Sequence, residues 1–157
     1  MLFLDEPSIG IDPVGARELR ATVAGLASGG TTVLLTTHYM FEADELCDRI
    51  AVIAGGRLVA QGTPADLKRG VTTSHVLEAE VFGDAGPALA GVRALPGVTA
   101  VSVEESGQAQ VLVVRSTGSA DLEPQLRQAL DGLTLGRVAD RAPTLEDAYV
   151  ELVGRAG

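Results

Sequence analysis

The sequence predicts an α/β fold for the first part of the chain and a small α+β fold for the rest. Before residue 70, short apolar segments of strand length alternate with segments of helical periodicity. This alternation is typical of a parallel sheet with helical crossovers. After residue 70, strands with alternating polar and apolar residues flank a tight turn. We therefore expect two domains, residues 1–70 and residues 71–157.

The first domain begins with an apolar run at 2–4, for which we expect a buried strand. Pro and Gly residues make 5–13 a loop. Asp12 before Pro13 predicts the N-cap of a helix that extends to about Ser28. The further expected elements are a buried strand at 31–37, a helix at 39–48, a strand at 49–54, a glycine turn at 55–56 leading into RLVAQG, and a helix capped by Thr63.

The helix expected at 39–48 has apolar and acidic residues on different faces. The residues expected to face inward are Met40, Ala43 and Leu46, and those expected to face outward are Glu42, Asp44 and Glu45. Cys47 lies beside Leu46 and is expected to be a small buried apolar residue.

The second domain is expected to alternate strands and helices in the order βαββαβ, followed by a terminal helix. Strands are expected at 76–81, 98–105, 109–115 and 133–140, with helices at 84–95, 119–131 and after Pro143. Residues 106–108 are expected to form a hairpin turn. This order matches a ferredoxin-like arrangement, in which a split βαβ unit forms one antiparallel sheet.

Composition excludes several classes of protein. The formal net charge is −9, so nonspecific nucleic-acid binding is not expected. The single cysteine cannot form an intramolecular disulfide, which suits a reducing compartment. No segment reaches the roughly 20 apolar residues of a membrane-spanning helix, and the N-terminal residues carry no basic region typical of a signal peptide.

Two adjacent acids, Asp5 and Glu6, follow the first expected strand. Open α/β sheets bind ligands at the carboxyl ends of their strands, and neighbouring side chains there point to opposite sides. One carboxylate could therefore serve a metal ion while the other faces a water molecule. A solvated turn after a strand explains the same two acids without any site.

Four segments resemble, in order and spacing, the ATP-binding subunit of ABC transporters. LFLDEP resembles its Walker B segment, SIGIDP its D-loop and LLTTH its H-loop. EADELCDRIAVIAGGRLVAQGTPADL resembles its closing stretch. The resemblance covers residues 1–70 and implies part of a P-loop NTPase sheet.

The resemblance also implies a role for each matching residue, with ATP and Mg²⁺ as cofactors of the intact protein. Asp5 would hold Mg²⁺ through its water shell, and Glu6 would polarise the attacking water as general base. His38 would contact the γ-phosphate, although a hydrogen-bonded histidine at a strand end is the structural alternative. Asp12 would act across a dimer interface on the partner's nucleotide.

The phosphate-binding part of such a site is not found in the sequence. There is no GxxxxGK followed by Ser or Thr, and the single lysine, Lys68, lies between Leu67 and Arg69. The Gln-loop and the Leu-Ser-Gly-Gly-Gln signature are also missing. We therefore expect the C-terminal half of a subunit, which alone hydrolyses no appreciable ATP. Its strands would have unpaired edges, so the region would associate with another chain or rearrange.

The last segment, PTLEDAYVELVGR, resembles the drug- and antibiotic-export branch of these ATPases. That resemblance implies an ABC-2-type membrane permease and a second ATP-binding subunit as partners, no nucleic acid, and a peripheral place on the cytoplasmic face of the membrane. A non-catalytic association or effector-binding module remains the alternative. A DNA-repair or translation ATPase is disfavoured by the acidic charge and by this tail.

The remaining titratable residues of the second domain suggest no catalytic site. His75 lies in a Thr/Ser-rich segment and is expected to have no special role. Glu104 and Glu105 precede a hairpin and are expected to face solvent. Glu146 and Asp147 are expected in the first turn of the terminal helix, where negative charge is favourable.

Overall fold

The computed structural model describes residues 1–71, 75–118 and 122–156. The chain divides into two compact units, residues 1–67 and residues 68–155. In the described part of the chain, no helix has the length and apolar character needed to cross a membrane.

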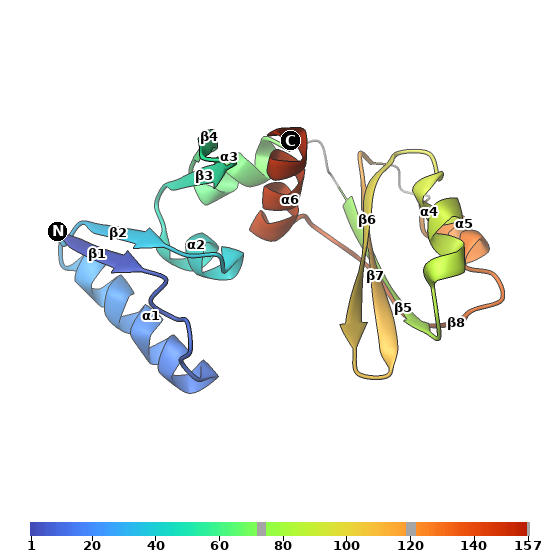
Figure 1. Ribbon diagram of the computed structural model, residues 1–157, viewed down its shortest axis with the longest axis horizontal. Helices are drawn as coiled ribbons and strands as arrows, with labels where there is room; N and C mark the ends of the chain where they lie inside the picture. Colours follow the sequence, from blue (N-terminus) through green and yellow to red (C-terminus); the bar gives the residue numbers. More distant parts are fainter. Residues whose placement is uncertain (72–74, 119–121, 157) are drawn as a thin grey trace. The chain divides into compact units, whose positions relative to one another are not determined.

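The first unit begins with two strands that pair in parallel. Its elements are β1 (Leu2–Asp5), α1 (Pro13–Ser28), β2 (Val33–Thr36), α2 (Met40–Leu46), β3 (Ile50–Ala54), β4 (Arg57–Gly62) and α3 (Pro64–Arg69), whose last residues belong to the second unit. In β1 and β2, Leu2 lies opposite Val33 and Asp5 lies opposite Thr36. The carboxyl ends of the two strands therefore meet at one edge, with α1 as the crossover (Figure 1).

The expectation that the first three strands share one parallel sheet is wrong for the described residues. β3 pairs with β4 in a separate antiparallel sheet, with Ala54 opposite Arg57. Gly55 and Gly56 connect these strands with φ of +55° and +73°. Such a two-residue turn favours a local hairpin, which explains why β3 takes β4 as its neighbour.

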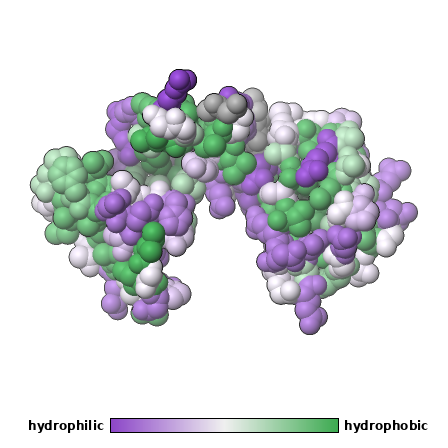
Figure 2. All heavy atoms as spheres, viewed as in Figure 1, coloured by the Kyte–Doolittle hydropathy of each residue, from purple (hydrophilic) through white to green (hydrophobic). Residues whose placement is uncertain are grey.

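The expectation that β1 and β2 are buried strands is also wrong. Phe3 and Leu34 are register partners, yet they are 66% and 53% exposed. The remaining apolar residues of both strands alternate with them and are half-buried, whereas Asp5 and Thr36 at the strand ends are exposed. Hydrophobic surface is visible over this part of the chain in Figure 2. Each strand therefore has only one of its two faces covered by other residues. The first unit buries few apolar residues: Val23, Ala43, Val52 and Leu67.

The second unit contains one four-stranded antiparallel sheet. Its elements are β5 (His75–Phe82), a short 3₁₀ helix (Gly86–Ala88), α4 (Leu89–Arg93), β6 (Val98–Ser106), β7 (Ala109–Ser116), α5 (Leu122–Ala129), β8 (Thr134–Arg141) and α6 (Leu145–Ala156). The strand order across the sheet is β6-β7-β5-β8. The expected sequence of strands and helices is confirmed, although residues 119–121 of the helix expected at 119–131 lie outside the described residues.

The core of the second unit lies between the sheet and helices α4 and α5, which cover one face (Figure 1). Its members are Leu77, Ala79, Val81, Ala85, Val92, Leu112, Val114, Leu122, Leu126 and Leu130. Alternate residues of β7 point to the opposite face, where Val113 and Arg115 are also buried. The first turns of α6 cover that face, since Asp147 contacts Arg115 and Ala148 is fully buried.

Candidate functional site

The candidate site lies where β1 and β2 end side by side. The backbone N–H of Glu6 donates to the carbonyl oxygen of Thr36 at 3.0 Å and lies 3.1 Å from the hydroxyl of the same residue. These bonds continue the strand pairing by one residue beyond β1 and fix where the acidic loop leaves the sheet.

Glu6 and His38, both expected as catalytic residues, are in direct contact. Oε2 of Glu6 lies 2.8 Å from Nδ1 of His38 and accepts a second bond from the backbone N–H of His38 at 3.2 Å. Glu6 has a φ of +46°, a left-handed conformation that is costly for a residue with a side chain. The bonds to Thr36 and His38 hold it there, so the side chain is oriented by both strand ends.

The expected metal ligand, Asp5, lies beside this pair. Its Oδ1 accepts a hydrogen bond from the hydroxyl of Thr36, and the residue is exposed. Carboxylate and hydroxyl oxygens are hard donors that suit a cation such as Mg²⁺. Among the described residues, no group of three or more His, Cys, Asp or Glu could hold a metal ion. Asp5 therefore fits one contact to a hydrated cation whose other ligands come from a phosphate or from water.

Asp12 lies at the start of α1, and its carboxylate is used by its own helix. Oδ1 accepts from the backbone N–H groups of Val14 at 3.0 Å and Gly15 at 3.2 Å. With Pro13 as the first helical residue, the N-cap expected from the sequence is confirmed. The structure thus brings Asp5, Glu6 and His38 to one strand end and gives Asp12 a separate, capping role.

A buried carboxylate behind the site was missed by the sequence reasoning. Glu42, expected to face outward, is 1% exposed. Its oxygens accept from the hydroxyls of Ser8 and of Thr37, the latter at 2.9 Å. Arg20 approaches the same carboxylate at 3.7 Å. The expectation failed because helical periodicity assigns an acid to the outer face unless its partners, which come from distant segments, are known.

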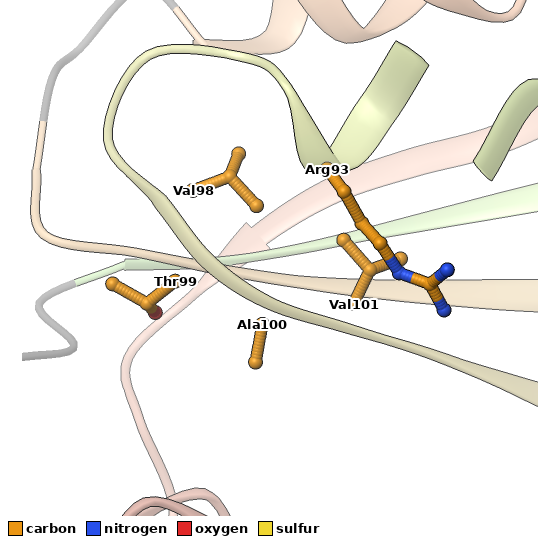
Figure 3. Close-up of a pocket in the computed structure, with 5 residues that line it drawn as sticks. All are labelled: Arg93, Val98, Thr99, Ala100 and Val101. Carbon is orange, nitrogen blue, oxygen red and sulfur yellow. The ribbon is translucent and has the colours of Figure 1, made fainter. Parts of the chain in front are cut away.

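Neither of two hollows on the described surface adds a catalytic group to this site. A shallow groove of about 320 Å³ runs beside α1 and the start of α2, with Tyr39 and Phe41 among its walls. A hollow of about 350 Å³ in the second unit is lined by Arg93 and by residues 98–101 of β6, with Arg93 extending past Val101 (Figure 3). It contains no acid or imidazole, so it resembles no hydrolytic site.

The other titratable residues singled out in the sequence have structural surroundings. Burial, with Asp48 and Glu42 adding negative charge nearby, raises the pKa of the Cys47 thiol, which is half-buried just beyond α2. His75 lies 3.3 Å from Asp140 on the exposed side of β5. Glu104 and Glu105 are exposed, as expected.

Asp147 lies in the first turn of α6, as expected, and it is buried. Oδ1 accepts from Arg115 at 2.8 Å and Oδ2 from Arg141 at 2.6 Å. Burial alone would raise the pKa of Asp147, but hydrogen bonds from Arg141 and Thr144 outweigh it and hold that pKa below its ordinary value. This network joins α6 to the sheet.

No protein-family model matches the sequence. Curated relatives match nearly all of it. A daunorubicin resistance ATP-binding protein of Streptomyces coeruleorubidus is 39% identical over 156 residues, which are 98% of this chain and 48% of that protein. A fluoroquinolones export ATP-binding protein of Mycobacterium tuberculosis is 35% identical over 155 residues, covering 99% of this chain and 44% of that protein.

A Nod factor export ATP-binding protein of Ralstonia nicotianae is 38% identical over 158 residues, covering 99% of this chain and 47% of that protein. The chain thus spans about half the length of the curated relatives it matches. These similarities extend through both units and confirm the resemblance carried by the motifs. By this similarity the chain corresponds to about half of an ABC transporter ATP-binding protein.

Proposed function

We propose that the chain is part of the subunit that binds and hydrolyses ATP in a bacterial ABC exporter of drugs or antibiotics. The observation that carries this proposal is the contact of Glu6 with His38 beside Asp5, at the joined carboxyl ends of two parallel strands. The export functions named for the relatives support the exporter class.

In this function Glu6 is the general base. Its Oε2 is engaged by His38, whereas Oε1 accepts no hydrogen bond from the described residues and can accept one from a water molecule. Phosphoryl transfer depends mainly on positioning and on charge stabilisation. A carboxylate that orients the attacking water therefore supplies the positioning part of catalysis.

His38 fixes Glu6 and faces the nucleotide with its other ring nitrogen. When Nδ1–H donates to the Glu6 carboxylate, a neutral ring presents Nε2 as an acceptor for water. A protonated ring presents a donor there, which can reach a phosphate oxygen. Either state leaves the Glu6–His38 contact intact.

ATP and Mg²⁺ are the proposed cofactors. Asp5, with the Thr36 hydroxyl on its Oδ1, would hold the hydrated ion from one side. When bound, Mg²⁺ neutralises charge on the phosphates. The phosphate cradle must come from polypeptide outside this sequence, because residues 1–157 contain no GxxxxGK segment. The chain alone is therefore inactive.

The proposed partners are an ABC-2-type permease and a second ATP-binding subunit, with a peripheral location on the cytoplasmic face of the membrane. Asp12 would contact the second subunit's nucleotide. The proposed domains are residues 1–70, part of the nucleotide-binding domain, and residues 71–157, a ferredoxin-like accessory domain. The strand order β8-β5-β7-β6, with a helix after β5 and after β7, supports the ferredoxin-like arrangement.

The test is a chimera in which residues 1–157 replace the matched part of the Streptomyces daunorubicin resistance protein. We expect Mg²⁺-dependent ATP hydrolysis. Its rate should fall at least about 100-fold in Glu6→Gln, because general-base catalysis is lost. Glu45→Gln, on the exposed side of α2, is the matched control and should keep the activity. Turnover by residues 1–157 alone, or turnover that survives Glu6→Gln, would refute the assignment.

A non-catalytic association module is the second candidate, favoured by the exposed apolar residues on β1 and β2 and by the missing phosphate cradle. Light scattering and Mg-ATP titration of the chain separate the two ideas. Stable self-association, together with a folded chimera that binds no nucleotide, would favour the association module.

A further inference from the structure

We propose that Glu42 is a positioning residue that holds the acidic loop against the end of β2, so that Glu6 meets His38. The catalytic importance of this role rests on the proposed function, whereas the contacts that define it lie among the described residues. Glu42 touches neither Glu6 nor His38. It acts through the residues next to them in the chain.

Burial of Glu42 calls for an explanation. A charged carboxylate that is 1% exposed is unfavourable unless hydrogen bonds and an opposite charge compensate it. Oε1 accepts from the Ser8 hydroxyl and lies 3.7 Å from Arg20, and Oε2 accepts from the Thr37 hydroxyl at 2.9 Å. Both oxygens are therefore occupied, each by a hydroxyl from a different segment.

The two hydroxyls come from the two sides of the site. Ser8 follows Glu6 by two residues in the acidic loop and is itself only 8% exposed. Thr37 immediately precedes His38 at the end of β2. A single carboxylate thus bridges the loop that carries the proposed base and the strand end that carries its imidazole partner.

The position of Glu42 is itself fixed by the same segment. The Thr37 hydroxyl accepts from the backbone N–H of Tyr39 at 3.0 Å, and the carbonyl of Tyr39 accepts from the N–H of Glu42 at 3.0 Å. Thr37, Tyr39 and Glu42 form a closed set of bonds at the start of α2. These bonds tie the carboxylate to the strand end, so it can serve as an anchor for Ser8.

The strained backbone of Glu6 makes such an anchor necessary. A residue at φ +46° stays there only when its surroundings over-determine it. Thr36 holds the backbone before the loop, and the bond from Ser8 to Glu42 holds it after. Loss of the second anchor would let the loop relax and draw the Glu6 carboxylate from His38.

The side-chain chemistry explains why glutamate suits this place. The two hydroxyls donate to different oxygens of Glu42, and a carboxylate has an acceptor at both positions, whereas an amide has one and an alanine has none. Bonds from neutral donors to a charged acceptor are also stronger than neutral ones. Glu45 on the same helix is the natural control, because its side chain is 58% exposed and contacts Arg20 rather than Ser8 or Thr37.

The experiment is NMR of the ¹⁵N-labelled chain without nucleotide, at one fixed neutral pH. The chain has two histidines, so the ring nitrogens of His38 report the contact with Glu6 and those of His75, in the second unit, are an internal control. Four variants are compared with the unaltered chain: Glu42→Ala, Ser8→Ala, Glu45→Ala and Glu6→Gln.

We expect Glu42→Ala and Ser8→Ala each to move the His38 Nδ1 signal toward its position in Glu6→Gln. The amide of His38, which donates to Glu6, should exchange roughly tenfold faster, as expected for losing a hydrogen bond to a charged group. A fifth variant that combines Glu42→Ala with Ser8→Ala should move His38 little further than either change alone, since both changes remove the same bond between Ser8 and Glu42. Glu45→Ala should leave His38 as it is, and His75 should not move in any variant.

Unchanged His38 signals in Glu42→Ala and Ser8→Ala overturn the proposal, even if both variants are less stable, because a merely structural role lowers stability without moving His38. If Glu42→Ala unfolds the first unit, Ser8→Ala decides alone, since it removes only the loop's hydroxyl. The outcome is separable from the proposed function. If the His38 signals move in Glu42→Ala and Ser8→Ala but the unaltered chimera is inactive, the positioning role stands and the proposed function fails. If the His38 signals do not move but the chimera is active, the positioning role fails and the proposed function stands.

Discussion

Oε2 of Glu6 accepts hydrogen bonds from both the ring and the backbone N–H of His38, at 2.8 and 3.2 Å. Helix α1 and strand β2 lie between the two residues in the sequence, and the parallel pairing of β1 with β2 brings them together. The contact is partly open to solvent, with side-chain exposures of 33% for Glu6 and 56% for His38. The contact therefore orients the Glu6 carboxylate more than it stabilises the fold.

Stability measurements should show that the Glu6–His38 pair contributes little to the free energy of unfolding. We expect Glu6→Gln and His38→Ala each to lower the free energy of unfolding by less than about 1 kcal/mol, because partly exposed ion pairs contribute little. Urea unfolding followed by circular dichroism measures the change. A loss of several kcal/mol in either variant would mean that the pair holds the first unit together.

Removal of the Asp12 carboxylate should weaken helix α1. Oδ1 of Asp12 satisfies the backbone N–H groups of Val14 and Gly15, so Asp12→Ala should destabilise the first unit by about 1 kcal/mol. Asp12→Asn retains an oxygen acceptor and is the matched control, with little expected change. If Asp12→Ala and Asp12→Asn unfold at the same urea concentration, the cap contributes nothing measurable.

The elements of the fold followed from local patterns in the sequence. Asp12 and Pro13 indicated the start of α1, glycines indicated its end, and the hairpin of β6 and β7 turns at Gly107, with φ of +64°. Which strands pair with each other was harder to predict from the sequence. β3 pairs with β4 because of a glycine turn, and which strand lies beside which depends on the whole sheet rather than on any one segment.

The candidate site was only partly visible in the sequence. Glu6 and His38 lie at the ends of recognisable strands, so the sequence indicates both as candidate site residues. Glu42 was assigned to solvent, because periodicity reports the face of a helix but not the donors that reach it from elsewhere. Its partners Ser8 and Thr37 are ordinary hydroxyl residues whose significance depends on three-dimensional contact.

The thiol of Cys47 should react slowly in the folded chain. Burial, together with the negative charges of Asp48 and Glu42, raises the pKa of this thiol, and the thiolate is the nucleophile. We expect a disulfide reagent to modify Cys47 more slowly in buffer at neutral pH than in urea. Equal rates in the two solvents would show that the native surroundings do not protect it.

The buried pair of Arg115 and Asp147 should be a main determinant of stability in the second unit. Their side chains are 6% and 1% exposed, and Arg115 also donates to the hydroxyl of Ser102. Asp147→Ala leaves a buried guanidinium without its carboxylate, which costs about 3 kcal/mol or more. Glu146→Ala, at the neighbouring exposed position, is the control and should change stability by less than about 0.5 kcal/mol. Similar unfolding midpoints for both variants would contradict this assignment.

The same network predicts how stability depends on pH. Burial opposes the charge of Asp147, but the hydrogen bonds from Arg141 and Thr144 prevail, so its pKa in the folded chain lies below the ordinary value of 3.8. The unfolded chain then binds a proton at a higher pH than the folded chain does. The stabilising contribution of Asp147 is therefore complete above pH 3.8 and is lost as the pH falls from that value through the folded pKa.

Urea unfolding of the chain and of Asp147→Asn, repeated from neutral pH to below pH 3.8, isolates this contribution from that of the other acids. Asp147→Asn should be less stable at neutral pH, because the uncharged amide cannot pair with Arg115 and Arg141. The difference between the two proteins should shrink as the pH falls, since protonation removes the same charge from the unaltered chain. A difference that stays constant or widens in acid would mean that Asp147 keeps an ordinary pKa, and that hydrogen-bond geometry rather than charge joins α6 to the sheet.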